Sequence, residues 1–288
     1  MSGTGSAANR VIVYDASARR VTPFGAVARA CDELSRSWYV MWRLFLRGFL
    51  SQFRQRVLGY AWAVIMPVLA VISFVFLYYA GLLQPGETGV PYPVYVLVGT
   101  TIWGVLANAV TAVGGSLQAH SDLVVRTNIP RLSLALSALG TVLYGTLASM
   151  IAMGVVFLVF RTMPTPMFAL YPLLVLPFVL IGAAIGLVLS VVSVIAKDAT
   201  AIATQALTLL MYATPVVFVS ATVEQELVRA VIEWNPLSAV IELPRSLILG
   251  EGPRPVGMYL ACTGGAVVLL GVCLWFFYVL DDLVAERL

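Results

Sequence analysis

Residues 162–196 read TMPTPMFALYPLLVLPFVLIGAAIGLVLSVVSVIA, a run of 35 residues without one Asp, Glu, Lys or Arg. About 20 mostly apolar residues are enough for a helix to cross the hydrocarbon core of a bilayer. The whole chain of 288 residues has this character, because 60% of it is hydrophobic and only 11% is charged. Soluble domains carry about 25% charged residues. The composition therefore excludes a soluble globular enzyme and a disordered chain.

Five further stretches also lack charged residues, and each is long enough for one span. They cover residues 57–86, 88–121, 132–160, 199–223 and 255–280. Because none of them is long enough for two spans, we expect an all-α, polytopic membrane protein with six transmembrane helices in residues 57–288. The first stretch begins too late in the chain, and is too long, to be a signal peptide.

The basic residues predict the orientation of these spans. Nine arginines precede the first stretch. If both termini are cytoplasmic, 13 of the 17 basic residues lie on the cytoplasmic side and 4 on the other. The opposite orientation reverses this ratio and violates the positive-inside rule. We therefore expect a multi-pass protein with both termini in the cytoplasm.

An amphipathic helix is expected at residues 33–56, after an extension at residues 1–32 whose role stays open. Four arginines there fall within a sector of about 40° on an α-helix, whereas aromatic and aliphatic residues fill the rest of its circumference. This pattern is typical of a helix that lies in the membrane interface. Either it docks a partner or it is a simple anchor. The four residues are Arg36, Arg43, Arg47 and Arg54.

The chain has no residues arranged for catalysis, cofactor binding or metal binding. It has no glycine-rich phosphate loop, and its one lysine, Lys197, follows an alanine. His120 is the one histidine, and the three cysteines lack metal-ligand spacing. The predicted spans contain no charged side chains (Asp, Glu, Lys or Arg), which proton-driven and ion-driven transporters keep inside the bilayer. Energy for transport must therefore come from a separate subunit.

Five short motifs then resemble the membrane permease of ABC-type exporters of polysaccharides such as O-antigen, capsule and teichoic acid. The resemblance covers about residues 50–250, although Lys197 and Thr214 stand where the family usually has arginine and serine. The motifs are Phe53-Arg54-Gln55-Arg56 with Leu58-Gly59-Tyr60-Ala61-Trp62 and Pro67; Pro91-Tyr92-Pro93 with Gly99 and Trp103; Asn128-Ile129-Pro130-Arg131; Lys197-Asp198 with Thr214-Pro215; and Asn235-Pro236-Leu237 with Glu242, Arg245 and Gly250.

The resemblance implies a homodimer of this chain that binds two copies of an ABC ATPase in the bacterial inner membrane. ATP and Mg²⁺ would bind the ATPase, so this chain would need no cofactor and would act on no nucleic acid. A short helix in the loop 121–131 would enter the ATPase, unless this loop is an ordinary charged turn. The residues expected to couple the two subunits are Arg43, Arg47, Arg54, Leu123, Arg126, Asn128 and Arg131.

Residues 224–254 mix charges with apolar runs too short to span, and they break at Asn235-Pro236. We expect a re-entrant pair of helices on the outer side, since backbone at membrane depth must be buried in protein or line water. A surface hairpin is the alternative. The residues expected to form an outer gate are Asn235, Pro236, Glu242 and Arg245.

Aromatic side chains in and near the first span suit a path for sugar rings, whose C–H faces pack on aromatic rings. The same residues would equally serve as interfacial anchors. Gly182 and Gly186, four residues apart, would allow close helix packing. The candidates for the substrate channel are Tyr60, Trp62, Phe74, Tyr78, Trp103 and Tyr212.

The sequence therefore predicts a transport subunit rather than an enzyme: the permease of an ATP-driven exporter of lipid-linked polysaccharide. Two rivals stay open. One is a related ABC permease that exports drugs or lipids, and the other is an intramembrane acyl- or glycosyltransferase, for which His120 is the one weak catalytic candidate. The identity and length of the glycan, its lipid carrier, and whether transport is processive do not follow from the sequence.

Overall fold

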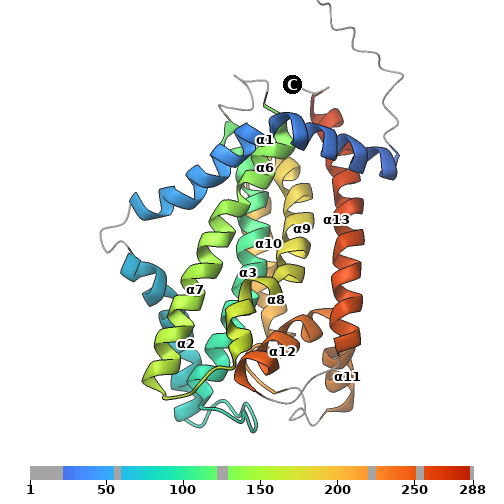
Figure 1. Ribbon diagram of the computed structural model, residues 1–288. Coiled ribbons are helices and arrows are strands. Elements are labelled where there is room, and N and C mark those ends of the chain that lie inside the picture. The colour runs from blue at the N-terminus through green and yellow to red at the C-terminus, as the bar shows by residue number, and fades with distance from the viewer. Residues whose placement is uncertain (1–21, 55–59, 122–128, 220–224, 251–255, 286–288) are drawn as a thin grey trace, which may run out of the picture.

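The computed structural model describes residues 22–54, 60–121, 129–219, 225–250 and 256–285, without the side chains of residues 51–54, 60–64, 281–285 and some other helix positions. Its long helices run side by side as a bundle (Figure 1). Helix α1 (Pro23–Arg54) lies across one end of this bundle, and the short helices α11 (Glu226–Trp234) and α12 (Pro236–Leu249) lie at the other. We call these the α1 end and the α12 end.

Four segments of the described chain are long and apolar enough to cross a membrane. They are α3 (Tyr92–Gly114), α6 (Arg131–Ser137) continued by α7 (Leu139–Val159), a segment of η2 (Pro166–Leu170), α8 (Tyr171–Leu174) and α9 (Leu176–Ile195), and α13 (Val256–Ala285). The charge-free run 162–196 thus contains one of them, Pro166–Ile195. This confirms the all-α class and four of the six predicted spans.

The other two predicted spans lie on shorter helices. Helix α2 (Tyr60–Tyr79) covers 20 residues, and α10 (Ala199–Tyr212) covers only 14. At 1.5 Å per residue, 14 residues extend for about 21 Å, less than the roughly 30 Å of a bilayer core. The count of six spans therefore stays a prediction.

Helices α3 and α9 form the closely packed centre of the bundle. A Cβ atom at Gly182 would overlap the Cβ of Ala109, and one at Gly186 would lie 2.7 Å from the Cβ of Val113. The glycines thus allow the two helices to approach closely, which confirms the packing predicted for them. Ser193 on α9 also donates a hydrogen bond of 2.9 Å to the carbonyl oxygen of Gly114.

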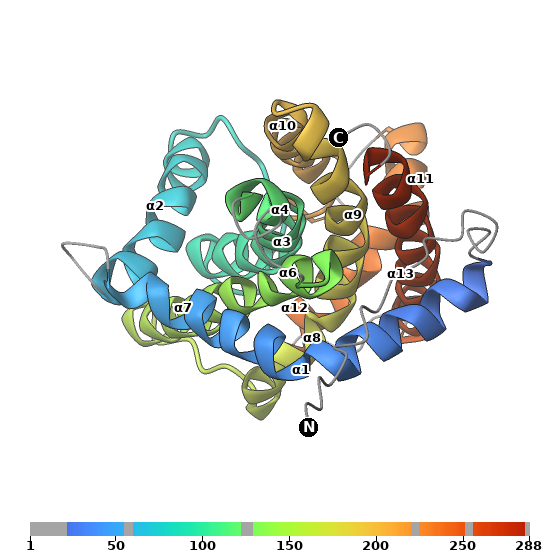
Figure 2. The same ribbon diagram turned by 90° about the horizontal axis from the view of Figure 1, so that it is seen from above.

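Helix α1 begins at Pro23 rather than near Glu33, where the arginine pattern placed its start. Proline suits the first turn of a helix, and Ala26 and Ala30 in the added turns are buried. The helix runs along the α1 end over α13, α6 and α7 (Figure 2). Packing of small residues on the bundle therefore extends the helix beyond the arginine-bearing part.

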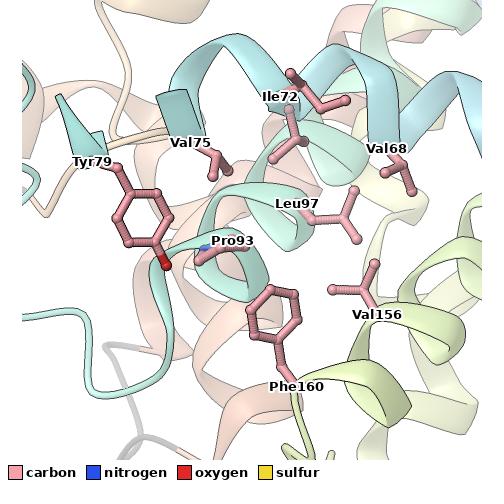
Figure 3. A pocket seen from close by; sticks show the side chains of 9 residues that line it. Val68, Ile72, Val75, Tyr79, Pro93, Leu97, Val156 and Phe160 are labelled. Atoms are coloured by element: carbon pink, nitrogen blue, oxygen red, sulfur yellow. The ribbon is translucent and has the colours of Figure 1, made fainter. Parts of the chain in front are cut away.

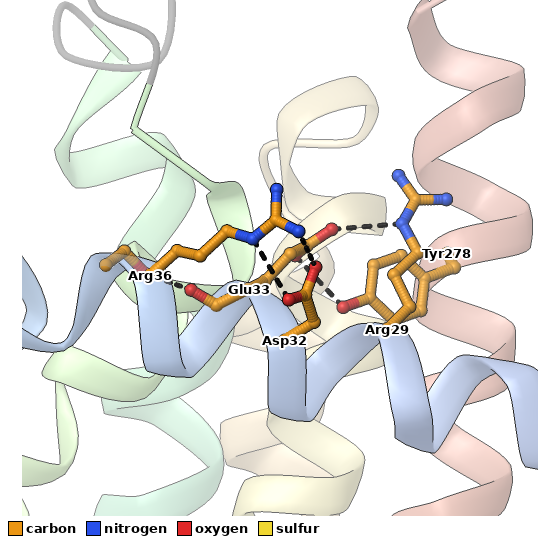
Figure 4. A network of polar contacts seen from close by, with 6 residues as sticks. Arg29, Asp32, Glu33, Arg36 and Tyr278 are labelled. Atoms are coloured by element: carbon orange, nitrogen blue, oxygen red, sulfur yellow. Dashed lines mark hydrogen bonds and ion pairs between the residues drawn. The ribbon is translucent and has the colours of Figure 1, made fainter.

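A polar network holds the first half of α1 on α13 (Figure 4). The hydroxyl of Tyr278 donates to Glu33 at 3.0 Å, and Arg29 pairs with the same carboxylate at 3.0 Å. Farther along, the hydroxyls of Ser37 and Ser133 are 2.6 Å apart in a buried contact with α6. Helix α1 is thus fixed to the bundle by specific contacts as well as by apolar packing.

Candidate functional site

The end of α10 creates the first feature of interest. Pro215 has no N–H group to continue the helix, and the hydroxyl of Thr214 donates instead to the carbonyl of Met211 at 2.9 Å. Residues 214–217 that follow are buried. The chain there is not helical, so its carbonyl groups need partners from elsewhere.

Two tyrosines of α3 supply such partners. The hydroxyl of Tyr92 donates to the carbonyl of Val217 at 3.1 Å, and that of Tyr95 donates to the carbonyl of Phe218 at 3.2 Å. Both tyrosines are buried. Helix α3 therefore holds the non-helical segment after α10 in place.

Arg245 of α12 completes this arrangement. Its side chain is only 2% exposed, its Nη2 donates to the carbonyl of Pro215 at 2.5 Å, and its guanidinium lies 4.2 Å from the ring centroid of Tyr95. Nε and Nη1 are also buried and have no hydrogen-bond partner among the described residues. A buried guanidinium is costly unless it is paired, so the carbonyl and the ring are its main compensation.

Gly99 allows these parts to meet. A Cβ atom at this position would overlap the carbonyl oxygen of Val216 and lie 3.1 Å from Nη2 of Arg245. Only glycine therefore lets α3 approach both the segment after α10 and α12. We call Tyr92, Tyr95, Gly99, Pro215 and Arg245 the Arg245 cluster.

The other residues predicted for an outer gate have different positions. The side-chain oxygen of Asn235 accepts a hydrogen bond of 3.0 Å from the N–H of Leu237, so it caps α12, and Pro236 is the first residue of that helix. Glu242 is half-buried on α12. Arg245 contacts both α3 and the segment after α10.

The predicted channel aromatics divide into two groups. Phe74 of α2 and Tyr212 of α10 have ring centroids 6.4 Å apart, and Tyr78 lies 4.6 Å from Tyr92. Trp103 is instead 4% exposed and packs edge-on against Phe178. It packs between α3 and α9, and its role in a channel stays a prediction. The side chains of Tyr60 and Trp62 lie outside the described residues.

The predicted coupling residues are described only in part. Arg43 donates to the hydroxyl of Tyr39 at 3.1 Å, and Arg47 lines a pocket at the α1 end. Arg131 is the first residue of α6, directly after Pro130. The residues that lie outside the described part of the chain are Leu123, Arg126 and Asn128, together with the side chain of Arg54.

An apolar pocket of about 210 Å³ lies between α2, α3 and α7 (Figure 3). Val68 and Ile72 of α2 face Leu97 of α3 and Val156 of α7 across it. In the described part of the chain, no three His, Cys, Asp or Glu side chains gather where they could hold a metal ion. The described side chains thus form packing contacts, hydrogen bonds between helices and the walls of pockets.

Sequence reasoning missed Tyr95 entirely and treated Tyr92, Gly99 and Pro215 only as parts of motifs. The sequence shows the order of these residues along the chain, but it does not show that they contact one another in the fold. Short apolar motifs 30 or more residues apart carry no signal of mutual contact in a single sequence.

Comparison with known proteins identifies the family of the chain. The chain is 24% identical over 229 residues to the O-antigen export system permease protein RfbA of Myxococcus xanthus, which covers 79% of this chain and 86% of that protein. Residues 39–249 match the family model for ABC-2 type transporters, from the middle of α1 to the end of α12. The chain therefore belongs to the ABC-2 type transporter family, as a membrane transport subunit rather than an enzyme.

Proposed function

We propose that this chain is the permease subunit of an ATP-driven exporter of lipid-linked polysaccharide. The observation that carries the proposal is the similarity to an O-antigen export permease over most of both chains. Membership of the family implies that an ABC ATPase works with the chain. The absence of charged residues from the predicted spans supports an external source of energy as well.

In the proposed assembly, two copies of the chain form a homodimer in the inner membrane, and each copy binds one ATPase, which holds ATP and Mg²⁺. Helices α2 and α10 complete six spans, and both termini are cytoplasmic. The placement of α1 and the end of α13 at one end of the bundle supports this orientation. So does the excess of basic residues on the predicted cytoplasmic side.

The proposed coupling surface lies at the α1 end and comprises the arginines of α1 and the loop before α6. Helix α1 is suited to transmit movement, because the Glu33–Tyr278 and Ser37–Ser133 contacts fix it to α13 and α6. A force on α1 would therefore move the bundle rather than α1 alone.

The proposed path for sugar runs along α2 and α10. Phe74 and Tyr212 lie near one another there, and Tyr78 and Tyr212 are exposed in the single chain. At the α12 end, α11 and α12 form the proposed re-entrant outer gate, with the Arg245 cluster as its attachment to α3 and α10.

A genetic experiment tests the function. Deletion of the gene should trap lipid-linked glycan inside the cell, and the wild-type gene should restore glycan to the surface. A strain that keeps normal surface glycan but becomes sensitive to drugs would contradict the polysaccharide assignment and favour the export of drugs.

A biochemical experiment tests the coupling surface. The purified complex with the ATPase should lose cargo-dependent ATP hydrolysis after Arg126→Glu with Arg131→Glu, because charge reversal would repel any acidic side chains by which the ATPase receives this loop. The control is Arg161→Glu in the turn after α7. Normal hydrolysis in the double variant would exclude a docking role for this loop.

A further inference from the structure

The apolar pocket of Figure 3 is a groove with a buried floor and an exposed rim. Val71 of α2 and Leu97 of α3 lie in its floor and are 5% and 2% exposed. Ile72 and Tyr79 of α2 and Phe160, directly after α7, form the rim and are 54%, 72% and 38% exposed. We propose that this groove binds one acyl chain of a phospholipid from the outer leaflet of the bilayer. The inference rests on the proposed function only where the α12 end is taken as the outer side.

The lining of the groove suits a hydrocarbon. It consists of nine residues, of which eight are apolar and the ninth is Tyr79 at the exposed end of α2. A sugar or a charged group would lose its hydrogen bonds with water there and gain almost none in return. The volume of about 210 Å³ exceeds the roughly 150 Å³ of an apolar cavity that binds benzene. A polar part of the ligand would therefore lie beside Tyr79, and its apolar part would fill the rest of the groove.

The groove is about as long as one leaflet is thick. Along α2 it extends from Val68 to Tyr79, which is about 17 Å at 1.5 Å per residue. Half of a hydrocarbon core of about 30 Å is about 15 Å. Tyr78 and Tyr79 end α2, and tyrosine is enriched at the depth where hydrocarbon meets head groups. An acyl chain that starts beside Tyr79 would therefore reach Val68 near the middle of the bilayer.

The helices around the groove place its opening in the bilayer. Helix α7 belongs to a segment long and apolar enough to cross a membrane, and it exposes Leu158 and Val159 beside Phe160. The turn after α7 is bonded to α12, because the N–H of Thr165 donates to the carbonyl of Ile248 at 2.9 Å. The groove thus lies in the half of the bundle nearer the α12 end. In lipid, apolar side chains gain little from the hydrophobic effect, but an empty groove gives up dispersion contacts that a chain restores.

An acyl chain in the groove would support one face of α2. Pro67, directly before Val68, lies inside this helix and cannot complete its hydrogen-bond pattern, so α2 bends most easily there. Beyond Pro67, Val75 faces the groove, whereas Phe74 lies about 100° around the helix and meets Tyr212 of α10. The chain would thus hold the part of α2 that follows the proline, and with it the position of Phe74 on the proposed sugar path.

The test uses the complex of permease and ATPase in nanodiscs of phosphatidylcholine. A trace of this lipid carries a photoreactive diazirine near the end of one acyl chain, and mass spectrometry locates the label after illumination. We expect residues 68–75 of α2 and Val156 of α7 to be labelled at least about fivefold more than residues 260–268 of α13, because roughly ten additional atom contacts hold a chain in the groove. The α13 residues are the reference, since Leu260 and Val268 are exposed and apolar but do not line the groove. Equal labelling of the two surfaces would overturn the proposal.

Two variants fill the groove from opposite walls. Val156→Phe on α7 and Val68→Phe on α2 should each lower the labelling of the groove at least about fivefold, because the added ring occupies the space of the chain. The matched controls are Val155→Phe and Leu69→Phe, which place the same ring on exposed neighbours that do not line the groove. Equal labelling in filled and control variants would contradict binding in the groove. If a filled variant does not fold, the label map of the unaltered complex still decides the question.

Other occupants of the groove would give different results. Label that appears there only with a photoreactive polyprenyl phosphate would assign the groove to the lipid carrier of the glycan, and the phospholipid proposal would fail. It would also fail if Ile72→Cys cross-linked two copies of the chain, because the second copy would then cover the groove. The proposed function is tested by export in the deletion strain, which does not depend on labelling of the groove, so failure of one inference does not decide the other.

Discussion

Replacement of Gly99 by alanine tests whether the Arg245 cluster supports the fold as the structure indicates. The added Cβ would overlap the carbonyl oxygen of Val216, and backbone cannot rotate away as a side chain does. Helix α3 and the segment after α10 must therefore separate. Overpacking of this kind costs about 1–3 kcal/mol.

The separation has a further cost, because three hydrogen bonds cross this contact. They join Tyr92, Tyr95 and Arg245 to carbonyls of the segment 215–218. Each contributes about 1 kcal/mol, and the bond from the charged guanidinium about 1.5–3 kcal/mol. The better helix propensity of alanine returns only about 1 kcal/mol. We expect a net loss of about 3.5–7 kcal/mol in the free energy of unfolding if all three bonds are lost.

Gly154→Ala in α7 is the matched control, since a Cβ there would meet nothing within 4 Å. Thermal unfolding of the purified protein can be monitored by its loss of monodispersity. The melting temperature should be lower for Gly99→Ala and unchanged or higher for Gly154→Ala. Surface glycan should fall only in cells with the first variant. Equal melting temperatures for the two variants would refute the tight contact at Gly99.

Three further predictions concern side chains. Tyr95→Phe should lower the stability of the chain in thermal unfolding by about 1 kcal/mol, because the hydrogen bond to Phe218 is lost. Tyr95→Leu should lower it by about 2 kcal/mol more, because the ring under Arg245 is lost as well. Equal losses of stability in the two variants would show that the contact between the ring and Arg245 does not contribute. Tyr278→Phe should speed amide hydrogen exchange in residues 23–36, because the Tyr278 hydroxyl ties this first half of α1 to α13. Exchange in the part of α1 beyond Ser37 should stay unchanged, since Ser37 is held by α6. An equal increase in exchange along the whole of α1 would contradict separate attachment of its two halves. Phe74→Ala and Tyr212→Ala should show a coupling of about 0.5–1.5 kcal/mol in a double-mutant cycle of thermal unfolding; strict additivity would show that the rings do not interact.

Length and composition were enough to predict α3, α7, α9 and α13, because crossing a bilayer demands about 20 apolar residues and little else. The same criterion overestimated α10. The charge-free stretch 199–223 continues past Tyr212, but the helix ends there because Pro215 interrupts the hydrogen-bond pattern. Hydropathy indicates whether a segment lies in an apolar environment, but it does not indicate where the helix ends. Pro215 was the feature of the sequence that indicated the end of this helix.

The start of α1 was misplaced for a related reason. The arginine register identified the part of the helix that bears charge, and that part begins near Glu33. The turns before it bury Ala26 and Ala30 against the bundle. Alanine spacing is a weak signal, because alanine is also common in exposed helices and in loops. The first turns were therefore determined by a tertiary contact that the pattern did not contain.

Trp103 and Tyr212 show why the sequence does not distinguish buried aromatic residues from exposed ones. In a soluble helix, polar residues mark the outer face and apolar residues the core. In α3 and α9 nearly every face is apolar, so an aromatic residue in the core and one facing a channel look alike in sequence. The structure separates them by burial, since Trp103 is 4% exposed against Phe178 whereas Tyr212 is 55% exposed beside Phe74. Arg245 is the converse case: a charged residue is expected at the surface, yet this one is buried because Gly99, Tyr95 and the carbonyl of Pro215 give it a place. In this chain Arg245 breaks the apolar pattern and marks a tertiary contact, whereas the aromatic residues that follow the pattern do not reveal which of them are buried.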